Sequence, residues 1–272
     1  MAAEEVISDH GTLLVVGTGI QWGGQMTLAA RDAVCRADRV LFAVTDPWGA
    51  RWIRSLNPRA ESLPYPRDGR PRREIYRAMT ERILEALARS ERVCAAFYGS
   101  PTFLVQAGHE AIAAARRAGH RARMLPGISS VECLAADLGI DLGAAGYQLF
   151  EANAFVAREP VVEPRGYLVL CQVAMIGQES AFDADPTRVQ RGLHALAARL
   201  EPLYGRRHRV IVYEAALHPL SSPKIIETEL HRLPELELSE VATLCIPPRE
   251  TLSLRAASHV VAASAFQPQS LG

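Results

Sequence analysis

The sequence predicts an α/β protein with a mostly parallel sheet in its first half and a mixed sheet in its second half. Short apolar runs alternate with helix-like segments through the first half, a pattern typical of a parallel sheet. Each of these runs ends in a turn rich in Gly, Pro or Ser. Three glycines within residues 139–146 then separate the halves, so we expect two α/β domains, residues 1–143 and residues 144–272.

Four strands and four helices are expected in the first half. The strands are the apolar runs at residues 12–16, 39–44, 92–98 and 122–125. Helices are expected over residues 27–37, from Pro71 to about residue 90, after Pro101 to about residue 118, and after Ser129 and Ser130. Pro71 suits the first helical position because a helix needs no N–H there, and serine is a good helix cap. The four prolines of residues 57–71 predict a loop.

The second half is predicted to contain more alternating strands, which favours a mixed sheet. Strands are expected at residues 167–172, 209–214 and 241–246. Long helices are expected at residues 187–204 and 222–233. The small, apolar tail from Arg255 onward has no assigned element.

Composition argues against several classes of protein. Thirty Lys and Arg balance thirty Asp and Glu, whereas a general nucleic-acid binder carries a basic excess. No apolar run reaches 18 residues and the N-terminus lacks an apolar signal segment, so we expect a cytoplasmic protein that does not span a membrane. Five cysteines without a CxxC pair, together with scattered histidines, argue against a disulfide framework and a metal site.

The turns after the first-half strands are candidate ligand loops. Ligands of open α/β sheets bind at the carboxyl ends of the strands, which here carry Gly17-Thr18-Gly19, Gly99-Ser100-Pro101 and Pro126-Gly127. The first turn has the spacing GxGxxxG instead of the dinucleotide spacing GxGxxG, so by itself it is weak evidence. Lys224 is the only lysine and lies far downstream, which excludes a Walker motif in this turn, and no GxSxG is present.

Taken together and in this order, the loops resemble the tetrapyrrole methylase family. LPGISS at residues 125–130 matches the family loop, and FYGSP at residues 97–101 stands where many members have a GDP-like loop. The resemblance implies S-adenosylmethionine as cofactor, in a cleft between two α/β domains, without a metal. The first loop reads GTGIQWGGQMTL, whereas members that methylate tetrapyrroles usually have GxGPGDPxLLT, and this difference argues against a tetrapyrrole substrate.

A narrower resemblance covers residues 17 to about 248. This stretch is similar to the borosin peptide backbone N-methyltransferases. The shared features are FYG-P at residues 97–101, ARMLPG at 122–127, ADLG at 136–139, QV-MIG at 172–177, Y-AA at 213–216 and T--IPP at 243–248. The implied reaction transfers a methyl group to a backbone amide nitrogen of a precursor peptide.

The borosin resemblance implies Arg72, Tyr76 and Tyr98 as catalytic residues. Arg72 and Tyr76 are four residues apart on an expected helix and therefore share one face. A guanidinium suits a developing oxyanion and lowers the pKa of a nearby phenol, so Tyr76 is the candidate base. Tyr98 is expected to orient or polarise the amide, and Tyr65 to bind the substrate. An ordinary surface pair of Arg and Tyr has the same spacing, so the spacing alone leaves both interpretations open.

The same resemblance implies the cofactor contacts. Ser129 and Ser130, at the start of a helix, are expected near the methionine carboxylate because a helix N-terminus favours anions. The expected cofactor-binding residues are Tyr98, Ser100, Phe103, Ser129, Ser130, Gln172, Ala215, Ala216, Ala242 and Thr243.

The resemblance also bears on the acceptor and the assembly. Fused borosin enzymes carry the peptide as a C-terminal extension after a helical clasp, and the residues after Pro248 leave no room for both. We therefore expect a separate precursor peptide, methylated in trans, by a homodimer or a heterotetramer with two precursors. The tail sequence VVAASAF is a weaker candidate for the core peptide. Two other interpretations stay open: methylation of a tetrapyrrole, rRNA or another small acceptor, and a non-catalytic module that binds S-adenosylmethionine or a peptide.

Overall fold

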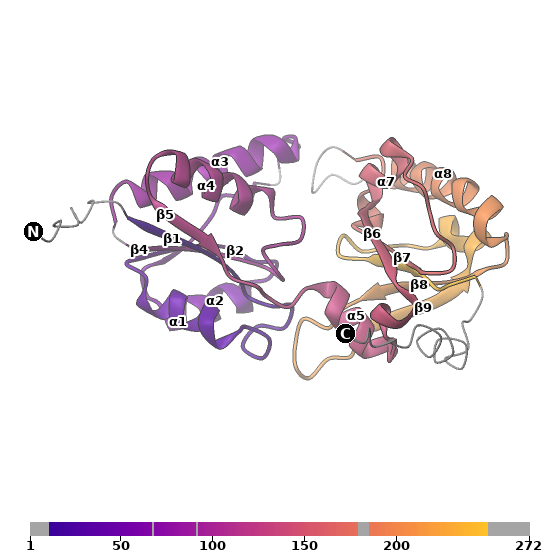
Figure 1. Cartoon of the computed structure of the whole chain (residues 1–272), viewed down its shortest axis with the longest axis horizontal. Helices are drawn as coiled ribbons and strands as arrows, with labels where there is room; N and C mark the ends of the chain where they lie inside the picture. Colours follow the sequence, from indigo (N-terminus) through magenta and orange to yellow (C-terminus); the bar gives the residue numbers. More distant parts are fainter. Residues whose placement is uncertain (1–10, 67, 91, 179–184, 250–272) are drawn as a thin grey trace, which may run out of the picture.

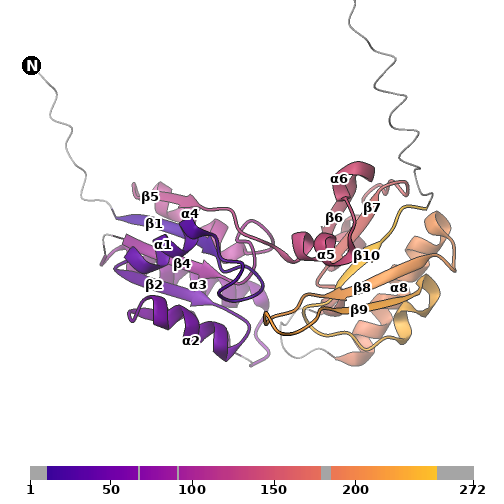
Figure 2. The same cartoon turned by 90° about the horizontal axis from the view of Figure 1, so that it is seen from below.

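Two five-stranded sheets lie side by side in the computed structural model, each with helices on both faces (Figures 1 and 2). The structure describes residues 11–66, 68–90, 92–178 and 185–249 of the 272. The first sheet is parallel and the second is mixed, which confirms the predicted fold class. The tail sequence from Arg255 lies outside the described residues.

The first sheet has the strand order β3-β2-β4-β1-β5. Its strands are β1 (Thr12–Gly17), β2 (Arg39–Ala43), β3 (Ala60–Ser62), β4 (Arg92–Phe97) and β5 (Arg121–Met124). The helices α1 (Leu28–Arg36) and α2 (Pro47–Leu56) cover one face, and α3 (Arg72–Leu87) and α4 (Gln106–Arg117) cover the other (Figure 1). Burial on both faces explains why β1, β2 and β4 are largely continuous apolar runs in the sequence.

The second sheet has the order β6-β7-β10-β8-β9. Its strands are β6 (Tyr147–Glu151), β7 (Tyr167–Cys171), β8 (Arg209–Glu214), β9 (Lys224–Glu229) and β10 (Thr243–Ile246). Only β6 and β7 are parallel neighbours. The helices α7 (Ala152–Arg158) and α8 (Pro186–Tyr204) pack on one face, and α5 (Ser130–Leu138) packs on the other, next to α6 (Leu142–Ala145) (Figure 1).

Local sequence signals account for several helix ends. The Thr27 hydroxyl accepts a hydrogen bond from the Ala30 amide at 3.1 Å, which satisfies a free donor at the start of α1. Asp46 caps α2 in the same way, and Pro47 takes the first helical position. Helix α5 is capped at its C-terminus by Gly139, whose φ of 63° is readily available to glycine.

The predicted helix over residues 222–233 is wrong. This segment forms strand β9 followed by a 3₁₀ helix, η2 (Leu230–Glu235). All six residues of β9 pair with β8, and Ile226 packs against the core of the second half. Pro234, which has no backbone N–H, stands in η2 and disfavours a longer α-helix. Cross-strand pairing therefore outweighs the helical pattern read from the sequence.

Other elements are absent from the sequence prediction. Helix α2 was not predicted, and the proline-rich segment expected to be a loop contains β3, which pairs with β2 through Leu41 and Glu61. Strand β6 and helix α7 were also missed. These are short elements, and β3 and β6 lie at the edges of their sheets, where the apolar signal is weak.

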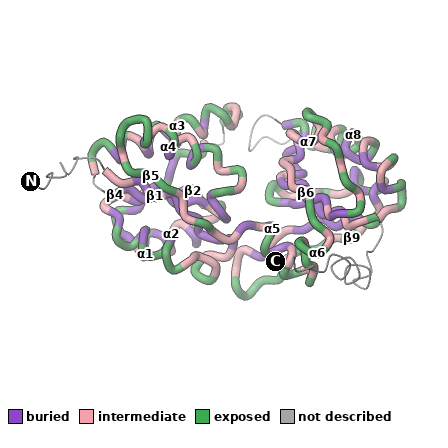
Figure 3. The backbone as a smooth tube through the Cα atoms, in the orientation of Figure 1, coloured by how far each residue is buried: buried purple, intermediate pink, exposed green. Residues whose placement is uncertain are grey.

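The chain passes from the first sheet to the second directly after β5. Leu134 of α5 packs against Tyr213 of β8, so α5 lies on the second sheet although it precedes the predicted boundary at residue 143. That boundary stays a prediction. The inner strands form the buried centre of each half, whereas the edge strands β5, β6 and β9 are partly exposed (Figure 3). Within the described ranges, no helix has the length and apolar character needed to cross a membrane.

Candidate functional site

The three candidate ligand loops of the first half meet at the carboxyl edge of the first sheet. Gly19 and Gly99 form an isolated antiparallel bridge between the first two loops. A Cβ added to Gly17 would lie 2.2 Å from the Gly99 carbonyl oxygen, and one added to Gly127 would lie 3.3 Å from the Gly17 Cα. Glycine is therefore required for this close approach between the backbones of the loops.

The cofactor-binding residues expected in the second half lie at one edge of the second sheet. Both β7 and β8 are antiparallel to β10, so the ends of β7 and β8 lie beside the start of β10. The Val173 amide donates to the Ala242 carbonyl at 3.2 Å, and this hydrogen bond joins the segment after β7 to the residue before β10. The structure thus brings five predicted cofactor residues to one edge: Gln172, Ala215, Ala216, Ala242 and Thr243.

Side-chain hydrogen bonds join the two sheet edges. Arg72, at the start of α3, donates from Nη1 to Oε1 of Gln172, directly after β7, at 2.8 Å. Trp22, in the turn after β1, donates from Nε1 to Nδ1 of His218, in the turn after β8, at 3.1 Å. The two rings also meet edge to face, with centroids 5.6 Å apart. The carboxyl edge of the first sheet therefore faces the corresponding edge of the second.

A cavity of about 420 Å³ lies between the halves. Arg72 and Tyr76 line it from α3, and Gln172 lines it from the second half. Tyr65 stacks on Tyr76 with ring centroids 6.4 Å apart and an interplanar angle of 16°. The structure therefore brings together four of the predicted site residues, Tyr65, Arg72, Tyr76 and Gln172. Tyr65 and Gln172 are more than 100 positions apart in the chain.

Arg72 occupies an electrostatically unfavourable position. It is the first residue of α3, where the helix dipole already supplies partial positive charge. Exposed Arg73 follows it and lines the same cavity. Among the described residues no carboxylate lies within ion-pair distance of Arg72, although Glu151 lines the same cavity. The cavity wall is suited to stabilising negative charge on a bound group.

Tyr98 belongs to a different cluster. It follows β4, its amide donates to the Ala43 carbonyl at 3.0 Å, and its ring packs with Ile20, Cys133 and Tyr213. Burial raises the pKa of Tyr98 above its ordinary value. The phenol is therefore protonated at neutral pH and can donate a hydrogen bond, but it cannot act readily as a base.

The residues after Tyr98 form a tight turn. Ser100 is buried, and its hydroxyl shares a hydrogen bond of 2.8 Å with that of Thr102. The Phe103 amide donates to the Ser100 carbonyl, and the next residue, Leu104, has a φ of 58° and lines the cavity. A positive φ is unusual for leucine, and such strain is concentrated at functional sites.

Ser129 and Ser130 stand at the start of α5 as predicted. The Ser129 hydroxyl accepts from the Val131 amide and is hydrogen-bonded to Glu132, whose carboxylate also accepts from the Ser129 amide at 2.7 Å. This is a capping box, so the Ser129 side chain already serves the helix. The predicted contacts of both serines with a cofactor stay predictions.

Sequence reasoning missed several residues that line the cavity. Glu151 and Asn153 reach it from the end of β6 and the start of α7, Gln178 from the segment after β7, and His109 from α4. The first two follow a strand that was not predicted. Had that strand been recognised, their place at its carboxyl end would have marked them as candidates.

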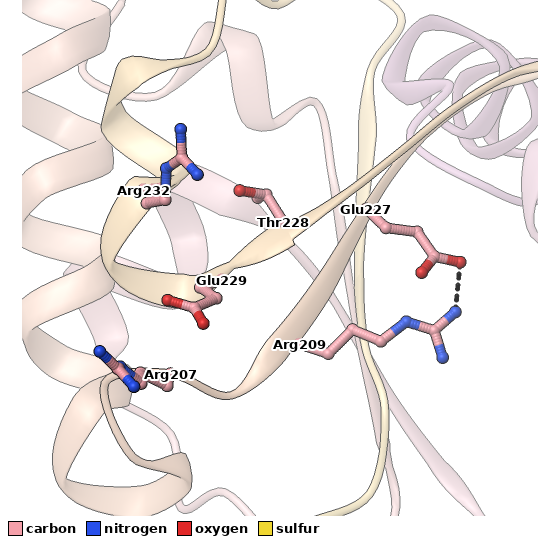
Figure 4. Close-up of a pocket in the computed structure, with 6 residues that line it drawn as sticks. All are labelled: Arg207, Arg209, Glu227, Thr228, Glu229 and Arg232. Carbon is pink, nitrogen blue, oxygen red and sulfur yellow. Dashed lines mark hydrogen bonds and ion pairs between the residues drawn. The ribbon is translucent and has the colours of Figure 1, made fainter.

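A second hollow of about 400 Å³ lies on the surface over β8, β9 and η2 (Figure 4). Its charges are largely paired: Arg209 pairs with Glu227, and Arg232 with Glu235 at 3.3 Å. In the part of the chain that the structure describes, no group of three His, Cys, Asp or Glu side chains is arranged to hold a metal ion.

The comparison with known families decides the relationship. Residues 12–232 match the family described as Tetrapyrrole (Corrin/Porphyrin) Methylases. The chain belongs to the tetrapyrrole methylase family. This confirms the family predicted from the loops.

Curated relatives of this tetrapyrrole methylase confirm the narrower resemblance. The methyltransferase/ribosomally synthesized cyclic peptide dendrothelin A precursor of Dendrothele bispora is 37% identical, over 88% of this chain and 58% of the relative. The corresponding omphalotin A precursor of Omphalotus olearius is 36% identical with the same coverage. A type III borosin cyclic peptide precursor of Anomoporia bombycina is 35% identical, over 88% of this chain and 28% of its own length. The chain thus spans at most about three-fifths of these relatives.

Solved structures show the same fold. Uroporphyrin-III-C-methyltransferase from Thermus thermophilus matches with a TM-score of 0.60 at 20% identity, covering 88% of this chain and 93% of that one. Another structure of the Thermus enzyme, complexed with S-adenyl homocysteine, has a TM-score of 0.58 at 19% identity, with the same coverage.

Proposed function

We propose that this tetrapyrrole methylase uses S-adenosylmethionine to methylate backbone amide nitrogens of a peptide. One observation carries the proposal: Arg72 and Tyr76 share a wall of a cavity between the two halves, and Gln172 faces them. The names of the curated relatives, which join a methyltransferase to a peptide precursor, support the same reaction. The glycine loops support a cofactor site because they lie at the carboxyl edge of the first sheet, where ligands of open α/β sheets bind.

The chemistry explains why such a pair is needed. An amide nitrogen is a poor nucleophile because its lone pair is delocalised into the carbonyl group. Removing the amide proton places negative charge on the carbonyl oxygen, which the Arg72 guanidinium stabilises. Tyr76 accepts the proton in its phenolate form, and protonated Tyr98 orients the amide as a donor. The bound cofactor supplies the methyl group.

We further propose that the acceptor is a separate precursor peptide and that the enzyme acts as a cytoplasmic homodimer without a metal. Exposed Arg73, Leu104 and His109 line the cavity, so an extended chain can enter from solvent. A short extended peptide also offers the backbone amides that the reaction requires. Light scattering of the purified chain alone and with the peptide tests the homodimer and the heterotetramer with two precursors.

The decisive experiment is methylation of a peptide from a neighbouring reading frame, followed by mass spectrometry at saturating cofactor. We expect mass gains of about 14 Da, the mass of one methylene. Tyr76→Phe should lower the rate by roughly 10² to 10⁴, as the loss of a general base does. Tyr147→Phe, at an exposed tyrosine of β6, is the matched control and should keep the full rate.

Two results would contradict the proposal. If Tyr76→Phe turned over like the control, the pair on α3 would be an ordinary surface contact. If the peptide stayed unmodified while a porphyrinogen gained methyl groups, the tetrapyrrole interpretation would replace it.

A further inference from the structure

Gln172 has an unusual backbone conformation next to the proposed catalytic pair. Its φ and ψ are 57° and 37°, the left-handed region, which a glutamine rarely adopts. Such a conformation is energetically unfavourable and persists only where the surroundings impose it. Its side chain ends on the Arg72 guanidinium, at 2.8 Å across the two halves.

The surroundings of Gln172 do impose this conformation. Cys171 before it is fixed in β7, and Val173 after it is fully buried and bonded to Ala242. Asn153 holds the following turn, because its side chain donates to the Met175 carbonyl at 2.9 Å and accepts from the Gly177 amide at 2.7 Å. The backbone on both sides of Gln172 is therefore rigid, and its amide group has a defined place in the cavity.

The nature of the partner matters as much as its position. Arginine side chains near a protein surface are commonly held by carboxylates, as Arg39, Arg82 and Arg209 are here. A carboxylate on Arg72 would neutralise the charge that a developing oxyanion needs. The Gln172 amide oxygen accepts one N–H without adding charge, and the remaining guanidinium donors stay available.

From these contacts we infer that Gln172 is a positioning residue, which orients Arg72 for catalysis and leaves its charge uncompensated. This inference rests on the proposed function, and it adds a role toward Arg72 to the cofactor contact expected for Gln172. The two roles have separate readouts. A cofactor contact is measured by affinity for S-adenosylhomocysteine, whereas a positioning role is measured by the rate at saturating cofactor.

The test compares Gln172→Glu, Gln172→Met and the remote control Gln190→Glu on the exposed side of α8. Single-turnover methylation at saturating cofactor should fall roughly 10- to 100-fold in both Gln172 variants, the usual effect of a small misplacement or loss of charge. The dissociation constant for S-adenosylhomocysteine should change much less than this rate. Gln172→Glu is nearly isosteric and keeps the acceptor, so its loss reports the charge and not the fold.

Chemical rescue gives a readout that a structural role does not produce. Arg72→Ala should recover part of its rate when guanidinium ion is added at low millimolar concentration. The double variant Arg72→Ala, Gln172→Met should not recover, because the amide that seats the ion is gone.

Each outcome separates the inference from the proposed function. Wild-type rates in Gln172→Glu, equal rescue in the double variant, or a loss confined to cofactor affinity would overturn the inference alone. A wild-type enzyme that binds S-adenosylhomocysteine but methylates no peptide would overturn the proposed function and the inference with it.

Discussion

Replacing Gly17 by alanine tests whether the contact between the glycine loops forms the cofactor site. The added Cβ would lie 2.2 Å from the Gly99 carbonyl oxygen and 2.8 Å from Cδ of Pro101, and neither atom belongs to a flexible side chain. The carbonyl has to move by about 1.2 Å to reach an ordinary contact of 3.4 Å. Because the two loops meet at the edge that faces the second sheet, this movement changes the shape of the proposed cofactor site directly.

The expected magnitudes differ for folding and for binding. Overpacking of this kind costs about 1–3 kcal/mol, less than the total stability of a typical domain, so the variant should still fold. A displacement near 1 Å in a functional site typically costs about 10²-fold, and we expect a loss of that order in affinity for S-adenosylhomocysteine.

Titration calorimetry with S-adenosylhomocysteine and urea unfolding measure the two effects separately. Gly24→Ala is the matched control, because a Cβ there meets nothing nearer than the Gln21 Oε1 at 4.0 Å. It lies in the same turn and should bind like the wild type. A folded Gly17→Ala protein with wild-type affinity would show that the loop contact has no part in cofactor binding.

Three further predictions concern stability and the contact between the halves. Burial raises the pKa of the Cys94 thiol from 9.0 to about 12, so the contribution of the neutral thiol to the free energy of unfolding is complete below pH 9 and is lost as pH rises towards 12. The Cys94→Ala variant should therefore lose stability less steeply at alkaline pH, by up to about 1.4 kcal/mol per pH unit. Urea unfolding between pH 9 and 11 measures this difference. Ser129→Ala removes the cap shared with Glu132 and should lower the free energy of unfolding by about 1 kcal/mol in the same assay at pH 7. Trp22→Phe keeps an aromatic ring but loses the hydrogen bond to His218, so affinity for S-adenosylhomocysteine should fall roughly 2- to 10-fold in calorimetry, and an unchanged affinity would place this contact outside the site.

The parallel sheet and its ligand loops were predictable because their signals are local. A buried parallel strand is a continuous apolar run, and the glycines that follow are required by the close approach at Gly17 and Gly99. The second sheet was harder to predict. Its edge strands β6 and β9 are partly exposed, and their apolar and polar residues alternate only weakly. Strand β9 forms because it pairs with β8, and such a pairing cannot be read from the local sequence.

The candidate site shows the same limit. Arg72 and Tyr76 were recognisable from their spacing and from the family resemblance, because four residues on one helix fix their relation. The bond between Arg72 and Gln172 joins positions 100 residues apart, and the left-handed backbone of Gln172 has no sequence signature. The position of Gln172 after a buried strand was predictable, but its partner was not.

The arrangement divides the proposed reaction between the two halves of the chain. The groups that handle the amide proton and oxygen stand on α3, whereas the group that orients the arginine is fixed to the second sheet. The guanidinium is therefore correctly held only when the two sheet edges face each other, and Trp22 with His218 bridges the same edges through other turns. Since a methyl transfer needs near-linear alignment, a site assembled from two rigid halves links the placement of the cofactor loops to that of the acceptor groups. We therefore expect substitutions at the contacts between the halves to lower the rate of methylation strongly while they change the free energy of unfolding only slightly.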